Sequence, residues 1–109
     1  MKRYCDDIAG TIVRFGASYD AFTKDIDFYN SVSMSIMQIG ELANGLSAEF
    51  KDATRRQMPW GAIRGMRNHF AHAYVTMDRS DVWETATKDT PVLLQFCETI
   101  IEKAAQETS

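Results

Sequence analysis

The sequence lacks the features of a membrane-spanning, an all-β or a secreted disulfide-rich protein. No apolar run approaches the roughly 18 residues that a membrane span requires, so we expect no membrane segment. Two prolines and six glycines are few for an all-β fold. No apolar region follows the basic residues at the N-terminus, which predicts no secretory signal and a cytoplasmic location. Cys5 and Cys97 lie far apart in the chain; we expect free thiols, with a disulfide between two helices as the alternative.

Charge is distributed unevenly along the chain. The net charge of −3 argues against a nucleic-acid partner. Between Lys51 and Arg79, however, six basic residues outnumber two acidic ones, so this segment carries +4 and the rest of the chain −7. A basic segment suits a phosphate-bearing partner, and a solvated surface of mixed charge is the alternative.

Hydrophobic periodicity predicts four long amphipathic helices. The length and ordinary composition of the chain indicate one globular domain over residues 1–109. Helices with short connections predict an all-α fold, an antiparallel bundle of four to five helices. The apolar stripes of the four helices are Tyr4, Ile8, Ile12, Phe15 and Tyr19; Val32, Ile36, Ile39, Ala43 and Leu46; Trp60, Ile63, Met66, Phe70 and Tyr74; and Val82, Trp83, Leu93, Phe96 and Ile100.

Residues typical of helix ends mark the expected boundaries. A connector is expected over residues 20–27, and Ser47 is a candidate N-cap of a short helix that ends near residue 56. Pro59 suits the first position of the third long helix. Asp81 with Glu84 resembles a capping pair at the start of the last helix, which Pro91 should kink.

The third long helix, over residues 59–74, has two different faces. Opposite its apolar stripe, Gly61, Gly65, Asn68 and His72 form one ridge, with Arg64 beside it. A glycine inside a helix costs roughly 1 kcal/mol relative to alanine, so two of them on one ridge favour close approach by a ligand or another backbone. Tight packing against a neighbouring helix is the alternative.

Few other chemistries fit these residues. His69 and His72 have an H-x-x-H spacing, but no third ligand is near in sequence, so we expect no metal site. Neither a nucleophile in a recognisable turn nor a glycine-rich phosphate loop is present. Glu41 could pair with an arginine of the third helix or stay solvated.

RNA phosphodiester cleavage without a metal does fit the segment from Arg67 to Tyr74. A histidine, with an ordinary pKa of about 6.5, can exchange a proton with the 2′-hydroxyl or the leaving oxygen near neutral pH. An arginine fork can hold the phosphate and stabilise its charge. A 2′-hydroxyl nucleophile would make the activity specific for RNA. One chain supplies a single such histidine, which favours a dimer with two motifs facing one groove.

Arg67-x4-His72-x-Tyr74 resembles the R-x4-H-x-Y motif of HepT-like toxins in the HEPN superfamily of helical domains. The resemblance extends over nearly the whole chain. Residues 38–47 are similar to the family's IGE-x-A-x3-LS stretch, residues 59–68 to its PW-x2-I-x-G-x-RN stretch, and Val82-Trp83-Glu84, with Asp89 and Pro91, to the start of its last helix.

This resemblance implies a HEPN-like homodimer that acts as a metal-independent endoribonuclease toxin. It implies that Arg67 and His72 are catalytic together with Asn68, and we expect Arg64 to support the phosphate. It further implies an antitoxin of the MntA type, a nucleotidyltransferase that uses ATP to AMPylate Tyr74; the chain itself would need no cofactor. His69 and Ala71 stand where aliphatic residues are commoner, which leaves open which histidine acts. The alternative is a non-catalytic HEPN adaptor that binds nucleotide or RNA for a nucleotidyltransferase.

Overall fold

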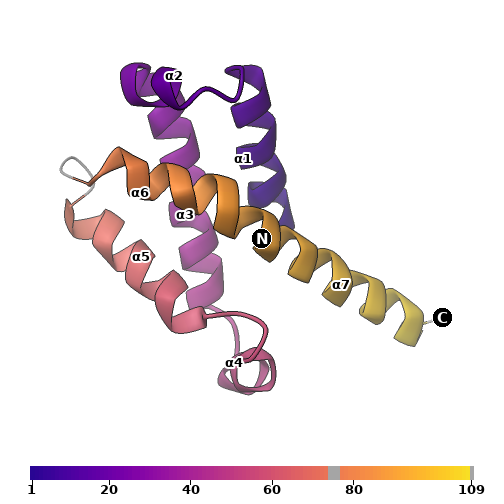
Figure 1. The fold of residues 1–109 in the computed structure, drawn as a ribbon. Coiled ribbons are helices and arrows are strands. Elements are labelled where there is room, and N and C mark those ends of the chain that lie inside the picture. The colour runs from indigo at the N-terminus through magenta and orange to yellow at the C-terminus, as the bar shows by residue number, and fades with distance from the viewer. Residues whose placement is uncertain (74–76, 109) are drawn as a thin grey trace.

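The computed structural model describes residues 1–73 and 77–108 of the chain. These residues form helices and no strand, which confirms the all-α prediction (Figure 1). The elements are α1 (Lys2–Arg14), α2 (Tyr19–Lys24), α3 (Ile26–Asn44), α4 (Ala48–Thr54), α5 (Trp60–Ala73), α6 (Arg79–Glu84), the π-helical segment η2 (Thr85–Asp89) and α7 (Thr90–Thr108).

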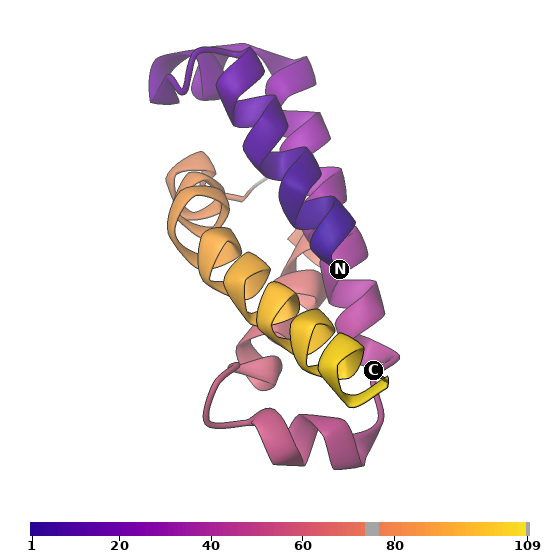
Figure 2. The same ribbon diagram turned by 90° about the vertical axis from the view of Figure 1, so that its right-hand side faces the viewer.

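The helices form an HEPN-like bundle around the pair α1 and α3. The two helices lie side by side and run in opposite directions, joined by the short α2 (Figures 1 and 2). α5 packs against α3, and α7 packs against α1. α4 lies at the end of the bundle where α3 stops and α5 begins (Figure 1). Among the described residues, no helix covers the side of α5 opposite its apolar stripe.

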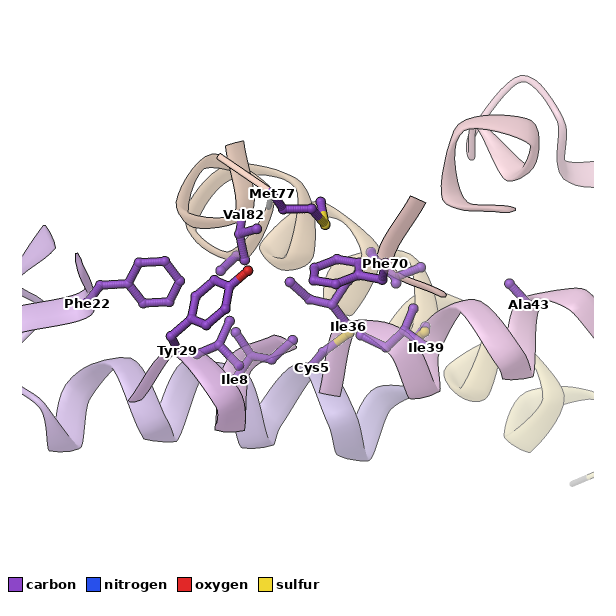
Figure 3. Close-up of a cluster of buried hydrophobic side chains, with 14 of the residues drawn as sticks. Cys5, Ile8, Phe22, Tyr29, Ile36, Ile39, Ala43, Phe70, Met77 and Val82 are labelled. Atoms are coloured by element: carbon purple, nitrogen blue, oxygen red, sulfur yellow. The ribbon is translucent and has the colours of Figure 1, made fainter. Parts of the chain in front are cut away.

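The apolar stripes predicted from the sequence meet in one core. Phe70 of α5 lies next to Ile36 and Ile39 of α3, with Met77 above it (Figure 3). The side chains of Phe70, Phe22 and the other large core residues are almost fully buried because each helix turns its apolar stripe inward. The largest fully buried side chains are Phe22, Phe28, Phe70, Ile8, Val32 and Val82.

The prediction for residues 15–27 was wrong in two respects. α1 ends at Arg14, because Gly16 and Ala17 take positive φ angles of 79° and 53° and turn the chain. Tyr19, assigned to the first stripe, instead begins α2, where the hydroxyl of Ser18 accepts a hydrogen bond from the backbone of Ala21. Tyr19 lies four residues after Phe15, so the spacing of the stripe stays helical although the helix itself has ended.

The expected connector over residues 20–27 is therefore mostly helical. α3 begins at Ile26, six residues before the first member of its predicted stripe, Val32. The carboxylate of Asp25 caps it by accepting from the backbone N–H groups of Asp27 and Phe28. Asp25 was assigned to a connector, whereas it both ends α2 and caps the start of α3.

Ser47 is confirmed as the N-cap of α4, where its hydroxyl accepts from the backbone of Phe50 at 3.1 Å. This short helix ends at Thr54, two residues earlier than predicted. Pro59 directly precedes α5, and its carbonyl accepts from Ile63, so proline at the helix start is confirmed within one residue.

The last helix starts with a different cap from the one predicted. Asp78, and not Asp81, caps α6: its carboxylate accepts from the backbone N–H of Ser80 at 2.9 Å and from its hydroxyl at 2.7 Å. The hydrogen bonds from Ser80 lower the pKa of Asp78. Asp78 is the cap because it lies directly before the first residue of α6, where a side chain can accept from the free backbone N–H groups.

Pro91 interrupts the last helix, as predicted. Its ring cannot donate a backbone hydrogen bond and crowds the preceding turn. The chain widens there into the π-helical η2, and the Thr90 hydroxyl donates to the carbonyl of Thr85 at 3.1 Å. α7 then continues to Thr108.

Both cysteines are free and buried, which confirms the prediction. Burial raises the pKa of the Cys5 thiol to about 12 and raises that of Cys97 as well. Among the described residues, no helix has the length and apolar character needed to cross a membrane.

Candidate active site on α5

The two faces of α5 differ in burial as the sequence predicted. Trp60 and Phe70 are buried, and Ile63 and Met66 are half-buried against the core. The ridge on the opposite face is exposed along its whole length, and it consists of Gly61, Gly65, Asn68 and His72, with the exposed Arg64 beside it.

The glycines of this ridge do not serve packing within the chain. A Cβ atom placed on Gly61 or on Gly65 would meet no atom within 4 Å. No helix among the described residues therefore uses the space that they leave. The alternative of tight packing against a neighbouring helix of the same chain is wrong for these two glycines.

Arg67 lies half-buried at the border of the two faces and is held from two sides. Its Nε and Nη2 atoms both lie 2.5 Å from Oε1 of Glu41 on α3. Its Nη1 donates to the Asn68 side-chain oxygen at 2.9 Å. Of the two arginines that Glu41 could have paired with, the structure selects Arg67.

These contacts leave part of the Arg67 guanidinium available. A guanidinium has five N–H donors, and the contacts with Glu41 and Asn68 engage three of them. No described residue engages the second N–H of either terminal nitrogen, and two such donors can bind two oxygens of a phosphate. Arg67 is thus oriented by its neighbours while keeping a two-pronged face for an anion.

Gly40 of α3 makes this position of Arg67 possible, and the sequence interpretation missed it. A Cβ atom on Gly40 would overlap the Cβ of Arg67, so the two helices cross closely here. Gly40 is buried and shares the core-facing stripe of α3 with Ile36 and Ala43. A glycine on a stripe of larger apolar residues is the signal that could have predicted a close helix crossing.

His72 and His69 have different surroundings. His72 lies on the glycine ridge, one turn beyond Asn68, and is exposed. His69 lines a hollow of about 250 Å³ at the far end of α5. Four carboxylates line the same hollow, namely Asp78, Asp81, Glu84 and Asp89. An anionic substrate would be repelled there, whereas no carboxylate contacts His72 in the described part of the chain.

Tyr74, the expected modification site, lies outside the described residues, and its role stays a prediction. The catalytic roles of Arg67, Asn68 and His72, and the supporting role of Arg64, are also predictions that the geometry accommodates. Within residues 1–73 and 77–108, no three His, Cys, Asp or Glu side chains are arranged to hold a metal ion.

The basic segment contributes cations that no carboxylate neutralises. In the described ranges, ion pairs engage Lys2, Lys24, Lys88 and Arg67. The other basic side chains make no ion pair there, and four of them, Lys51, Arg55, Arg56 and Arg64, belong to the basic segment. Except for Lys51, which is half-buried, these side chains are exposed.

Comparison with known proteins places the chain in a family. The chain matches the family described as "Ribonuclease HepT-like" over residues 1–100. It is 32% identical to a protein named "Putative RNase" in Caldanaerobacter subterraneus subsp. tengcongensis over 88 residues, which cover 81% of this chain and 78% of that one. It is 25% identical to a "Putative RNase" of Methanocaldococcus jannaschii, covering 72% of this chain and 80% of that one.

No solved structure matches the chain significantly. The family match spans all the helices up to the middle of α7 and includes the segment that carries Arg67, Asn68 and His72. The chain therefore belongs to the HepT-like ribonuclease family and is an enzyme of the ribonuclease class.

Proposed function

We propose that the protein is the toxin of a type II toxin–antitoxin system, an endoribonuclease that cleaves RNA without a metal at Arg67, Asn68 and His72. The observation that carries the proposal is the state of Arg67. Glu41 and Asn68 orient its guanidinium at the edge of an open face, and no described residue engages the two N–H groups that remain for a phosphate. The exposed His72 lies on the same face.

The proposed reaction is an internal transesterification. His72 takes the proton of the ribose 2′-hydroxyl, and the 2′-oxygen forms a bond to the adjacent phosphorus. The bond from phosphorus to the 5′-oxygen of the next nucleotide breaks, and that oxygen receives a proton. The products are a 2′,3′-cyclic phosphate and a free 5′-hydroxyl, so DNA, which lacks the 2′-hydroxyl, is not cleaved.

Arg67 and Asn68 stabilise the charge that develops in this reaction. Negative charge on the non-bridging phosphate oxygens increases as the 2′-oxygen attacks. The two free N–H groups of Arg67 can bind these oxygens in a bidentate manner. Removal of one such donor typically lowers the rate by about 100- to 1,000-fold.

A homodimer would supply the second proton-transfer group. His72 of one chain would act as the base, while the same residue of the second chain would protonate the leaving oxygen. The exposed Gly61 and Gly65 allow two copies of α5 to approach closely, because no Cβ atom separates the backbones. The cleft between the two ridges would then hold the RNA.

Tyr74 is the proposed site of neutralisation by an MntA-type nucleotidyltransferase antitoxin. Its hydroxyl oxygen would attack the α-phosphorus of ATP, release pyrophosphate and leave AMP on the tyrosine. Tyr74 follows Arg67 by seven residues in the sequence. The negative phosphodiester would compete with RNA for the guanidinium, and the nucleoside would fill the cleft.

Cleavage of RNA by the purified protein tests the enzymatic part. We expect the wild type to release fragments with cyclic phosphate ends, and we expect Arg67→Ala and His72→Ala to lose at least about 100-fold in rate. Equal cleavage by all three proteins would show that the site is wrong. Absence of cleavage by the wild type, with retained binding of the nucleotidyltransferase, would favour the non-catalytic adaptor.

Mass spectrometry after co-expression with the antitoxin tests the regulatory part. We expect the mass of one AMP group on the Tyr74 peptide of the wild type and none on the matched variant Tyr74→Phe. An active nucleotidyltransferase that leaves Tyr74 unmodified, or that modifies the phenylalanine variant equally, would contradict this proposal.

A further inference from the structure

A hollow of about 170 Å³ lies at the start of α5, on the side where α3 ends and α4 turns back. Ala43 and Asn44 of α3, Lys51 of α4, and Trp60, Gly61 and Arg64 of α5 line it. Two cations and one amide therefore face a single small space. This set of donors suits one phosphate group, which accepts hydrogen bonds through several oxygens.

The cations of this hollow have no competing carboxylate. Neither Lys51 nor Arg64 makes an ion pair with any described residue, although Glu49 and Asp52 are on the same short helix as Lys51. Lys51 is also half-buried rather than free in solvent. An unneutralised, partly buried cation is more favourable when an anion binds beside it.

The wall of the hollow is fixed by a buried hydrogen bond. The Trp60 indole N–H donates to the Thr54 hydroxyl at 2.9 Å, and that hydroxyl donates to the Phe50 carbonyl at 2.7 Å. These bonds attach α4 to the first residue of α5. Lys51, which lies between Phe50 and Thr54 on α4, is thereby held beside Gly61 and Arg64.

The hollow is in line with the proposed cleavage site. Arg64 precedes Asn68 by four residues and His72 by eight on the same helix. Four residues of α-helix correspond to about 6 Å. A stacked nucleic-acid strand advances about 3.4 Å per nucleotide, so the hollow lies about two nucleotides from Asn68.

The other end of α5 could not hold the same strand. There His69 lies among the four carboxylates Asp78, Asp81, Glu84 and Asp89. A phosphate on that side would meet negative charge, whereas on the Arg64 side it would meet two unpaired cations. The charges therefore favour an RNA strand that extends from the proposed cleavage site towards the start of α5.

From these observations we infer that the hollow of Asn44, Lys51 and Arg64 is a second phosphate subsite, which binds RNA about two nucleotides from Asn68 of the proposed cleavage site. The inference rests on the proposed ribonuclease function for the identity of its ligand. Lys51 and Arg64 bind the phosphate oxygens, and the Asn44 amide donates to one of them.

Binding of single-stranded RNA to the His72→Ala protein, measured against salt concentration, tests the subsite without cleavage. We expect the added changes Lys51→Ala and Arg64→Ala each to weaken binding of an oligonucleotide about tenfold. Together they should lower the slope of log affinity against log salt by roughly 0.7, the contribution of one phosphate of a single strand. A dinucleotide, too short to reach the hollow, should bind all variants alike.

Lys103→Ala is the matched control, because it removes one exposed lysine from α7. If Lys51→Ala and Arg64→Ala change oligonucleotide affinity no more than this control does, the subsite is wrong. If they weaken the dinucleotide equally, the cations act through general charge, and the subsite is again wrong. Failure of the wild type to cleave RNA would instead contradict the proposed function, because this binding measurement does not depend on cleavage.

Discussion

The two faces of α5 lie on one helix but differ in burial. On one face Phe70 is buried to 1% exposure and packs with the stripe of α3. On the other, Gly61, Gly65, Asn68 and His72 are exposed, and the two glycines lower helix stability without a packing contact from any described residue. The first face explains why the helix is there. The second face carries groups that the fold itself does not need, which is where function is expected.

Arg67 belongs to both faces, and this is what connects fold to chemistry. Its Cβ packs against Gly40, while its guanidinium reaches Glu41 and Asn68 at the edge of the open face. The crossing of α3 and α5 therefore sets the position of the group that we propose binds the phosphate. Changes on either face should separate effects on stability from effects on activity.

The largest effect on stability is expected from Phe70→Ala. Removal of a fully buried phenylalanine ring leaves a cavity between α3 and α5, and we expect a loss of about 3–5 kcal/mol in the free energy of unfolding. Urea unfolding at a fixed protein concentration measures it. On the opposite face, His72→Ala should change this free energy by less than about 0.5 kcal/mol. Similar losses for both variants would mean that the two faces do not differ as described.

Gly40→Ala should affect both stability and activity. The added methyl group overlaps the Cβ of Arg67, close to the backbone, so α5 has to move away from α3. We expect a loss of about 1–3 kcal/mol, typical of overpacking, and slower RNA cleavage because Arg67 is displaced. Gly10→Ala on α1, where a Cβ atom meets nothing within 4 Å, is the control. If Gly40→Ala resembles this control in unfolding and cleavage, the close crossing is unimportant.

Gly65→Ala should stabilise the helix and weaken the dimer. Alanine in place of an exposed helical glycine contributes up to about 1 kcal/mol, and no atom within 4 Å opposes it. The same methyl group would keep two ridges apart. Unfolding and analytical ultracentrifugation measure the two effects, and Gly10→Ala should show only the first. Equal self-association of Gly65→Ala and Gly10→Ala would show that the ridge does not form the dimer interface.

Glu41→Gln is expected to have only a small effect on stability. The pair with Arg67 is partly exposed, with side-chain exposures of 46% and 31%, and such pairs contribute about 0–1 kcal/mol. Cleavage should nevertheless slow by up to roughly tenfold, because the guanidinium loses the carboxylate that orients it. Single-turnover rates at saturating RNA measure this. An unchanged rate would show that Arg67 is positioned by Gly40 and Asn68 alone.

Helix caps and prolines predicted several helix boundaries correctly from the sequence. The hydroxyl of Ser47 caps α4, Pro59 precedes α5 and Pro91 interrupts the last helix, because each acts within one turn. The same rules failed around Tyr19, where an apolar stripe kept its helical spacing across a turn made by Gly16 and Ala17. The spacing of apolar residues does not reveal such a break when the next helix continues the same spacing.

The open ridge of α5 was also predicted from spacing, and its exposure is confirmed. Spacing could not choose between Arg64 and Arg67 as the partner of Glu41, nor bring Asn44 and Lys51 to the start of α5. These relations depend on how α3 crosses α5 and where α4 turns back. They are tertiary contacts between residues distant in sequence, and only the fold specifies them.

Comparison of His72→Ala with His69→Ala in RNA cleavage tests the central claim most directly. The two histidines are exposed and three residues apart on α5, but His72 lies on the glycine ridge and His69 among carboxylates. We predict that His72→Ala lowers the cleavage rate at least about 100-fold, whereas His69→Ala changes it by no more than about twofold and both proteins unfold like the wild type. Equal losses, or a larger loss for His69→Ala, would contradict the assignment of the active site to the open face of α5.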